Sequence, residues 1–249
     1  MVSDRSPQQL DPRGEMPILA HLEDIRRRLI RCLTAIIVCA LIAMCFSEEL
    51  FRWIAAPLIA ALPHSEDQMV FTSLPEVFVV YLKIGLFAGF IAAMPYVLFQ
   101  IWQFFVLGLY PTERSRVIAF VTVSTSFFLA GAAFCYYQVF PWGFRFFIGF
   151  SSDSIVPMIT MKEYLKFAIR LLLAFGLIFE MPVMSAFLAM LGVLTPEYLK
   201  KKRHYAIVII FTVAAFLTPP DVVTQLLMAA PMLVLYELSI LSAALFRRT

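Results

Sequence analysis

Charged side chains are scarce in this chain. Asp, Glu, Lys and Arg together make up 15% of the 249 residues, whereas hydrophobic residues make up 61%. A soluble domain of this length would carry many more charges. The net charge of +3 is too small to indicate nucleic-acid binding. Long apolar runs recur instead along the chain, and they predict an integral membrane protein.

The residues that build metal sites and disulfides are also few. The four cysteines lie in apolar runs without CxxC spacing, which favours a packing role over a disulfide or a metal site. His21, His64 and His204 are too scattered in the sequence to form a metal cluster. The sequence contains neither HExxH nor GxSxG, and no glycine-rich phosphate loop. We therefore expect neither an enzyme nor a bound cofactor.

The apolar runs are continuous, as in transmembrane helices, and lack the alternation of barrel strands. We predict an all-α integral membrane protein with six transmembrane helices. The predicted spans cover residues 29–46, 77–105, 117–140, 165–194, 205–217 and 222–246. At 1.5 Å per residue the fifth reaches only about 20 Å, against roughly 30 Å of hydrocarbon. It therefore needs flanking residues or a locally thinned bilayer.

Both ends of the chain carry segments outside these spans. Residues 1–16 lack the apolar region of a signal peptide and are expected to form a disordered cytoplasmic tail. Apolar residues at helical spacing over residues 17–29 predict an amphipathic helix lying in the membrane interface. Residues 247–249 would be a short cytoplasmic C-terminus, which leaves residues 17–246 as a single membrane domain.

Basic residues are distributed unequally between the two faces of the predicted bundle. Six spans place both termini on one side, where fourteen of the 20 Lys and Arg residues fall. The others fall on the opposite side, except Lys83, which lies inside the second span. Because cytoplasmic loops are enriched in Lys and Arg, we expect both termini to be cytoplasmic.

One predicted span holds a carboxylate deep in the apolar region. Glu180 lies roughly 15 Å along the helix from Arg170, near the middle of the bilayer. An isolated charge there costs on the order of 3 kcal/mol. Glu180 is therefore either a neutral acid hydrogen-bonded to another helix or a polar group facing a water-filled cavity. Pro182, like Pro95 and Pro231 in other spans, predicts bent helices and a curved bundle with a concave face.

Two further carboxylates are predicted at the cytoplasmic surface. Thr112 can cap the third span, so Glu113 falls in its first turn near the positive end of the helix dipole. Asp24 lies on the amphipathic helix. Two acids on one membrane face suit a ligand with adjacent arginines, because a guanidinium pairs with a carboxylate through a two-pronged fork. Alternatively, Asp24 and Glu113 pair with arginines of this chain, at positions 26–28, 114 or 116.

Eight short motifs, in a fixed order, resemble those of one known family. They are HLEDIRRRL (21–29), APL (56–58), QIWQF (100–104), GLYPTER (108–114), VFP (139–141), FGLIFEMPV (175–183), LTPPDVVTQ (217–225) and PMLVLYE (231–237). Together they are similar to the motifs of TatC, the multi-span receptor of the twin-arginine protein translocase. The resemblance implies six helices curved like a cupped hand, with cytoplasmic termini and two short final helices.

For function, the resemblance implies a receptor in the bacterial cytoplasmic membrane that binds twin-arginine signal peptides of folded precursors. It implies contacts to the signal peptide from Asp24, Glu113, Arg26 and Arg114. Asp24 stands where glutamate is commoner in the family, so its reach is one methylene shorter. The partners implied are TatB-like and TatA-like single-span subunits in an oligomeric complex within membrane lipid. The proton gradient, rather than ATP, would drive transport.

The resemblance also assigns three residues away from this surface. Glu180 matches the family's buried acid in the concave face and would contact a partner's transmembrane helix. Pro57 matches a proline of the first outer loop, and Asp221 matches an acid of the last outer turn. Without the resemblance, two other functions stay open. They are a proton-coupled small-solute secondary transporter using Glu180 as the proton carrier, and a passive membrane scaffold.

Overall fold

The computed structural model describes residues 18–62, 69–106, 117–150, 158–218 and 221–246. Within these ranges the chain is helical apart from its connections and one isolated bridge between Val70 and Thr160, which confirms the all-α class there. The helices are α1 (Ile18–Met44), α2 (Ser47–Ile59), α3 (Glu76–Val106), α4 (Val117–Phe134), the π-helix η2 (Cys135–Val139), α5 (Phe140–Ile148), α6 (Met161–Phe179), α7 (Met181–Met190), α8 (Pro196–Lys201), α9 (Arg203–Leu217) and α10 (Val222–Leu245).

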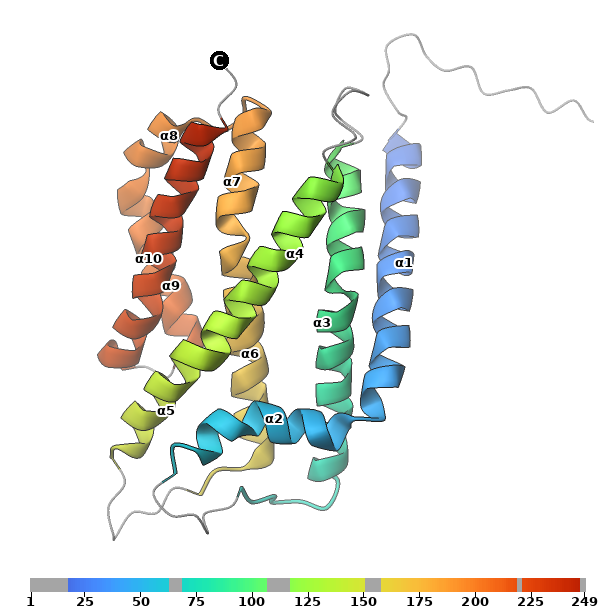
Figure 1. The fold of residues 1–249 in the computed structure, drawn as a ribbon, viewed down its shortest axis with the longest axis vertical. Helices are drawn as coiled ribbons and strands as arrows, with labels where there is room; N and C mark the ends of the chain where they lie inside the picture. The colour runs from blue at the N-terminus through green and yellow to red at the C-terminus, as the bar shows by residue number, and fades with distance from the viewer. Residues whose placement is uncertain (1–17, 63–68, 107–116, 151–157, 219–220, 247–249) are drawn as a thin grey trace, which may run out of the picture.

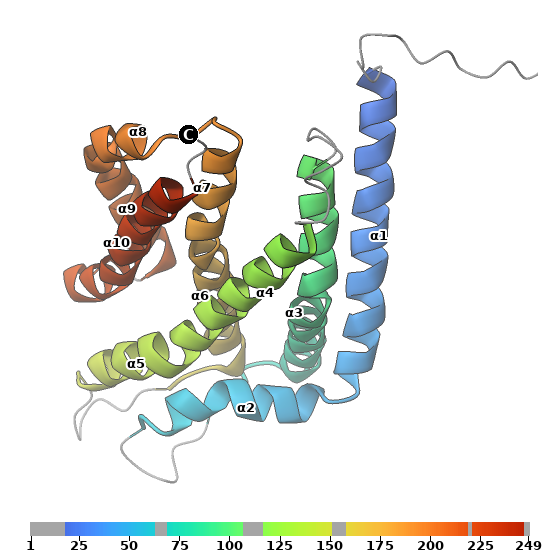
Figure 2. The same ribbon diagram turned by 45° about the horizontal axis from the view of Figure 1, so that its top comes forward.

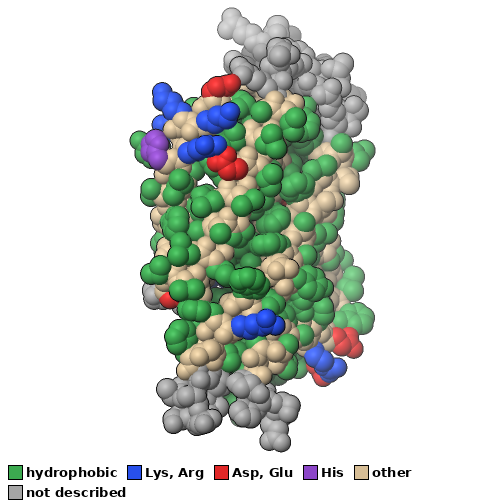
Figure 3. All heavy atoms as spheres, turned by 60° about the vertical axis from the view of Figure 1, so that its left-hand side comes forward, with side chains coloured by type: hydrophobic (Ala, Val, Ile, Leu, Met, Phe, Trp, Pro, Cys, Tyr) green, Lys and Arg blue, Asp and Glu red, His purple; other side chains and the backbone are tan. Residues whose placement is uncertain are grey.

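Several described segments are long and apolar enough to cross a membrane. Four meet this criterion alone: Glu76–Phe104, Ile118–Ile148, Met161–Met190 and Val222–Leu245. A fifth is obtained if Leu22–Met44 and Ser47–Ile59, which meet at 87°, count as one broken span. Figure 3 shows the corresponding surface, a broad apolar band with charged side chains gathered mainly toward its two ends.

The last two helices differ in length. α9 has 15 residues and is too short for the same criterion, whereas α10 has 24 and meets it. The expectation of two short final helices is therefore wrong for α10. Pro231 inside α10 does not end it, and the apolar run from residue 222 to residue 245 stays one helix.

The predicted interfacial helix over residues 17–29 is not a separate element. Residues 18–44 form one continuous helix, α1, since no proline or glycine interrupts them. The helix that lies across the bundle is instead α2, which falls between the first two predicted spans. It meets α1 at 87° (Figure 1).

The two ends of the bundle carry different elements. α1 begins and α10 ends at the same end, which we call the terminal end, while α2 crosses the opposite end, which we call the α2 end (Figure 1). The turned view in Figure 2 shows the same arrangement, with α6 and α7 running between the two ends. That both termini lie on one side of the membrane stays a prediction, because residues 1–17 and 247–249 lie outside the described residues.

α1 and α3 pack closely because glycines of α3 face α1. A Cβ added to Gly89 would lie 2.3 Å from the backbone nitrogen of Ala40. One added to Gly85 would lie 2.5 Å from the Cγ of Met44. Small residues at such positions let helix backbones approach in a membrane, where apolar burial alone gives little attraction.

Two tyrosine hydroxyls fasten α2 to the rest of the bundle. Tyr136 donates to the carbonyl of Trp53 at 2.6 Å, and Tyr164 donates to the carbonyl of Ile54 at 2.5 Å. The Trp53 carbonyl lacks its usual helical donor because the residue four positions later is Pro57, which has no N–H. The hydroxyl of Tyr136 therefore satisfies the acceptor that Pro57 leaves open.

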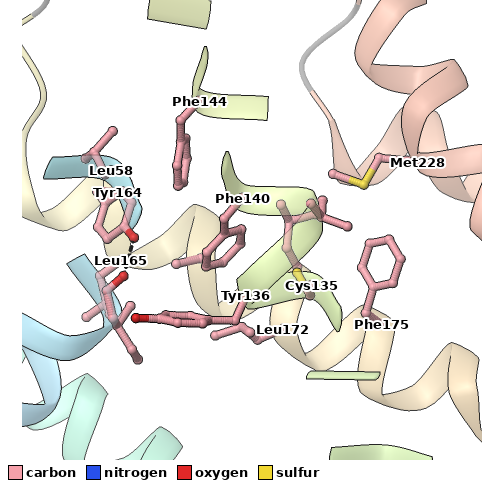
Figure 4. Packing of buried hydrophobic residues seen from close by; sticks show 14 of the residues in the cluster. Leu58, Cys135, Tyr136, Phe140, Phe144, Tyr164, Leu165, Leu172, Phe175 and Met228 are labelled. Carbon is pink, nitrogen blue, oxygen red and sulfur yellow. Dashed lines mark hydrogen bonds between the residues drawn. The ribbon is translucent and has the colours of Figure 1, made fainter. Parts of the chain in front are cut away.

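The largest buried apolar cluster lies behind these contacts. Cys135, Phe140, Leu165 and Phe175 are each at most 1% exposed. Figure 4 shows them converging from the α4–η2–α5 segment and α6, with Met228 of α10 at one edge. This core packs η2, α5 and α6 against α2 and α10.

Candidate functional site

Glu180 lies at a break in the helix that runs from α6 into α7. Its N–H bonds the carbonyl of Leu177, three residues back, because the regular helical pattern stops before Pro182. The side chain is only 8% exposed. Its Oε2 accepts a hydrogen bond of 2.6 Å from the hydroxyl of Ser124 on α4. The hydrogen bond with a neighbouring helix, which belonged to one of the two alternatives for Glu180, is therefore observed.

Ser124 is itself held by a third helix. The indole N–H of Trp102 on α3 donates to the Ser124 hydroxyl at 2.9 Å, and both side chains are almost fully buried. Since a hydroxyl has one proton, accepting from Trp102 directs that proton toward Glu180. The chain Trp102–Ser124–Glu180 thus joins α3, α4 and the α6–α7 break through two directed hydrogen bonds.

The second carboxylate oxygen of Glu180 has no such partner. Among the described residues, Oε1 of Glu180 and Oγ1 of Thr125 are the buried side-chain oxygens without a hydrogen bond. An unsatisfied buried acceptor costs free energy, so it marks either a site of strain or a group reserved for a ligand. Neither Trp102 nor Ser124 was predicted as a partner from the sequence. Trp102 lies 22 positions before Ser124, and Ser124 lies 56 positions before Glu180, so sequence spacing does not indicate either hydrogen bond.

An apolar hollow of about 530 Å³ lies between α4, α7 and α10. Pro182 and Val183 line it two and three residues after Glu180, and Phe120 and Phe127 line it from α4. Ser242 is the polar residue among its lining. A hollow of this character accommodates apolar side chains and offers little to a polar solute.

Asp24 is already engaged by an arginine of the same helix. Arg28 donates from Nε to Oδ2 of Asp24 at 2.7 Å, and from Nη1 to the side-chain oxygen of Gln103 on α3 at 2.9 Å. The side chain of Asp24 remains 32% exposed, whereas that of Arg28 is 12% exposed. Of the two alternatives drawn from the sequence, pairing within the chain is the one observed for Asp24.

The other predicted signal-peptide residues are placed only in part. Arg26 is exposed on α1, one residue before Arg27, which pairs with Glu23 at 2.6 Å. Glu113 and Arg114 lie outside the described residues. The predicted proximity of Asp24 and Glu113 therefore stays a prediction.

Asp221 and Pro57 hold local structure. Asp221 caps α10: Oδ1 accepts from the backbone N–H of Thr224 at 2.7 Å, and Oδ2 accepts from the Thr224 hydroxyl. Pro57 is half-buried inside α2 and exposes the Trp53 carbonyl to Tyr136. Both residues have a conformational role that the sequence patterns had not specified.

A second buried glutamate, Glu76, was not singled out from the sequence. It starts α3 at the α2 end and is 4% exposed. Oε2 accepts from the N–H and the hydroxyl of Thr72 at 2.8 and 2.9 Å, and Oε1 accepts from the N–H of Lys162 at 3.2 Å. The carboxylate thereby joins the start of α6 to the segment before α3, beside the bridge between Val70 and Thr160.

These elements define a multi-span α-helical membrane protein with a proline-broken helix and a half-satisfied carboxylate at the break. Comparisons with known proteins identify the class more closely. The family model described as Sec-independent protein translocase protein (TatC) matches residues 20–231. The chain belongs to the TatC family.

Individual relatives agree over nearly the whole chain. The chain is 50% identical to the Sec-independent protein translocase protein TatC of Desulforapulum autotrophicum, over 92% of this chain and 85% of that protein. It is 36% identical to the TatC of Escherichia coli K12, over 90% of this chain and 86% of that one. A crystal structure titled Twin Arginine Translocase Receptor TatC matches with a TM-score of 0.82 at 37% identity, covering 92% of this chain and all of that one.

Proposed function

We propose that this protein is the receptor subunit of a twin-arginine translocase in the bacterial inner membrane. It binds the paired arginines of signal peptides on folded precursor proteins and nucleates the export complex. The similarity to the solved twin-arginine receptor, over 92% of this chain, is the observation that carries the proposal. The partly exposed carboxylate of Asp24 at the terminal end supplies the chemistry.

In this proposal the chain crosses the membrane six times with both termini in the cytoplasm. α1 is the first span, and α9 serves as the fifth despite its 15 residues. The bilayer thins around α9, or flanking residues complete its length. The basic residues Lys200, Lys201 and Arg203 then face the cytoplasm, as the positive-inside rule requires.

Asp24 and Glu113 would each hold one guanidinium of the signal peptide by a charge-assisted fork. Such forks need arginine, since a lysine ammonium cannot make two parallel bonds to one carboxylate. Arg26 and Arg114 are close to these acids in the sequence and would contact the peptide backbone or its acidic groups. The apolar segment of the peptide would then lie along the bundle.

Glu180 would contact partner subunits. The single-span TatB-like and TatA-like partners would place a polar side chain at its open Oε1, while their apolar side chains enter the hollow between α4, α7 and α10. The apolar lining of this hollow is the reason that we do not propose a small-solute transporter.

Substitution of Asp24 by Asn tests the binding site directly. It removes the charge at nearly constant shape, so we expect binding of a twin-arginine peptide to the purified protein to fall about tenfold or more. Binding of a twin-lysine control peptide, weak from the start, should change little. The matched control is Glu23→Gln, which removes the acid next to Asp24 in the sequence. Glu23 pairs with Arg27, and its side chain is 60% exposed. Equal binding by wild type and Asp24→Asn would contradict the proposal.

A further inference from the structure

Arg28 is anchored far more firmly than the neighbouring arginines of α1. Its guanidinium bonds Asp24 through Nε at 2.7 Å and Gln103 through Nη1 at 2.9 Å. The same Nη1 lies 3.4 Å from both the carbonyl and the side-chain oxygen of Gln100. One side chain thus joins the acid of α1 to two glutamines on α3.

The adjacent pair on α1 shows that helical spacing alone does not produce this arrangement. Arg27 bonds Glu23 at 2.6 Å with the same spacing of four residues. Both members of that pair are at least 60% exposed, whereas the Arg28 side chain is 12% exposed. An exposed pair of this kind contributes little, because solvent and salt screen it. Arg28 is instead enclosed between two helices, with acceptors on both.

This contact leaves Asp24 neutralised by a guanidinium of the same chain. In the proposed receptor, Asp24 is the group that must accept a guanidinium from outside. Arg28 already donates to Oδ2, so an arriving guanidinium can form the fork with both oxygens of Asp24 only after that bond is released. We propose that Arg28 is a resident cation that occupies Asp24 in the empty receptor and yields it to the arriving arginine. This inference rests on the proposed function and adds a gate to its binding site.

The glutamines on α3 make this exchange feasible. Three of the four acceptors around Arg28 belong to Gln100 and Gln103, and one belongs to Asp24. A guanidinium carries five N–H donors, so Arg28 keeps partners on α3 after it leaves the carboxylate. Without those acceptors, release would leave a part-buried cation unpaired, which is costly.

The gate has a definite thermodynamic consequence. When only the open state binds, the apparent affinity is the intrinsic affinity multiplied by the fraction of open receptor. Opening belongs to the empty protein, so its cost is the same for every ligand that needs Asp24. Removing Arg28 should therefore raise the affinity for the twin-arginine peptide, whereas the affinity for the twin-lysine peptide, which forms no fork with Asp24, should change little.

Arg28→Gln tests the gate in the full-length protein in lipid nanodiscs, with a fluorescent twin-arginine peptide and its twin-lysine variant as probes. We expect the twin-arginine affinity to rise about fivefold, in line with the loss of one part-buried ion pair, and the twin-lysine affinity to change little. Arg27→Gln is the matched control, since it removes a charge from the exposed pair with Glu23, and it should leave both affinities within about twofold of wild type. Unchanged or weaker binding by Arg28→Gln would overturn the gate.

A second variant predicts an effect of opposite sign. Gln103→Leu removes the closest acceptor that holds Arg28 on α3. The closed state, in which Arg28 bonds Asp24, then becomes more populated, and the twin-arginine affinity should fall about threefold. A rise or no change would count against the exchange. The melting temperature of Arg28→Gln shows whether that variant folds. If it does not fold, Gln103→Leu still tests the exchange.

Asp24→Asn separates the gate from the proposed function. If it leaves twin-arginine binding intact, the binding site itself is wrong. If it weakens binding while Arg28→Gln fails to strengthen it, the receptor stands and Arg28 merely orients the acid.

Discussion

Glu76 and Glu180 are both buried glutamates, but the regions around them differ in how completely they satisfy polar groups. At the α2 end, three donors reach the two carboxylate oxygens of Glu76. The Tyr136 hydroxyl donates to the Trp53 carbonyl, which has no helical donor because Pro57 lacks an N–H. At the α6–α7 break, one hydroxyl reaches Glu180 and Oε1 has no partner among the described residues. Burial is similar, at 4% and 8% exposure.

The difference teaches that hydrogen-bond satisfaction, more than burial, separates a structural acid from a functional one. A fully satisfied carboxylate rigidifies its surroundings and has no capacity left for a ligand. A half-satisfied one keeps an acceptor available and carries an unfavourable free energy until a partner supplies a donor. We therefore expect Glu76 to stabilise the fold, and the open acceptor of Glu180 is the reason that we propose it as the contact for partner subunits.

The largest expected effect on folding is at Glu76. Glu76→Gln keeps the size of the side chain but turns an amide donor toward backbone N–H groups that need an acceptor. We expect the melting temperature in detergent to fall by roughly 5 °C or more. The control Glu163→Gln changes an acid that is 65% exposed and 3.7 Å from Lys166, and it should melt like wild type. Equal melting of both variants would remove the distinction between the two regions.

A smaller effect is expected at Ser124. Ser124→Ala deletes the only described donor to the Glu180 carboxylate and removes the acceptor of the Trp102 indole N–H. Leaving buried groups unpaired costs about 1–3 kcal/mol. Ser126→Ala is the control, because that exposed hydroxyl bonds only a carbonyl of its own helix. The cost of Ser124→Ala should shrink in a Glu180→Leu background, and full additivity of the two changes would contradict the coupling.

The smallest effect is expected at the anchor of α2. Tyr136→Phe leaves the Trp53 carbonyl without a donor and should cost about 1 kcal/mol of unfolding free energy. Pro57→Ala supplies the missing backbone N–H, so it should reduce the cost of Tyr136→Phe in the double variant. Denaturation of the four proteins measures this directly. A double variant that is as unstable as the sum of the single ones would show that Pro57 does not create the open acceptor.

The sequence predicted the features that depend on local pattern. The apolar spans, the break near Pro182 and the burial of Glu180 follow from hydrophobic runs and from the missing N–H of proline. The prediction of a separate interfacial helix was wrong, because amphipathic spacing over residues 17–29 does not specify where a helix ends.

Other features could not be predicted because they depend on contacts between distant residues. Glu76 reaches Lys162 over 86 positions, and Arg28 reaches Gln103 over 75. Helical periodicity identifies the face on which a residue lies but not the neighbour it meets. The pairing of Asp24 with an arginine of α1 was foreseen as one of two alternatives, whereas the role of the glutamines on α3 was not.

The assignment of Glu180 to assembly is tested most directly by Glu180→Gln in the full-length protein, measuring melting temperature and co-purification of the single-span partners together. The amide keeps the hydrogen bond from Ser124 and removes only the carboxylate, so we predict melting within about 2 °C of wild type and a loss of most partner. Wild-type recovery of the partners would contradict the account, and a large fall in melting temperature beside it would place Glu180 with Glu76 among the residues that stabilise the fold.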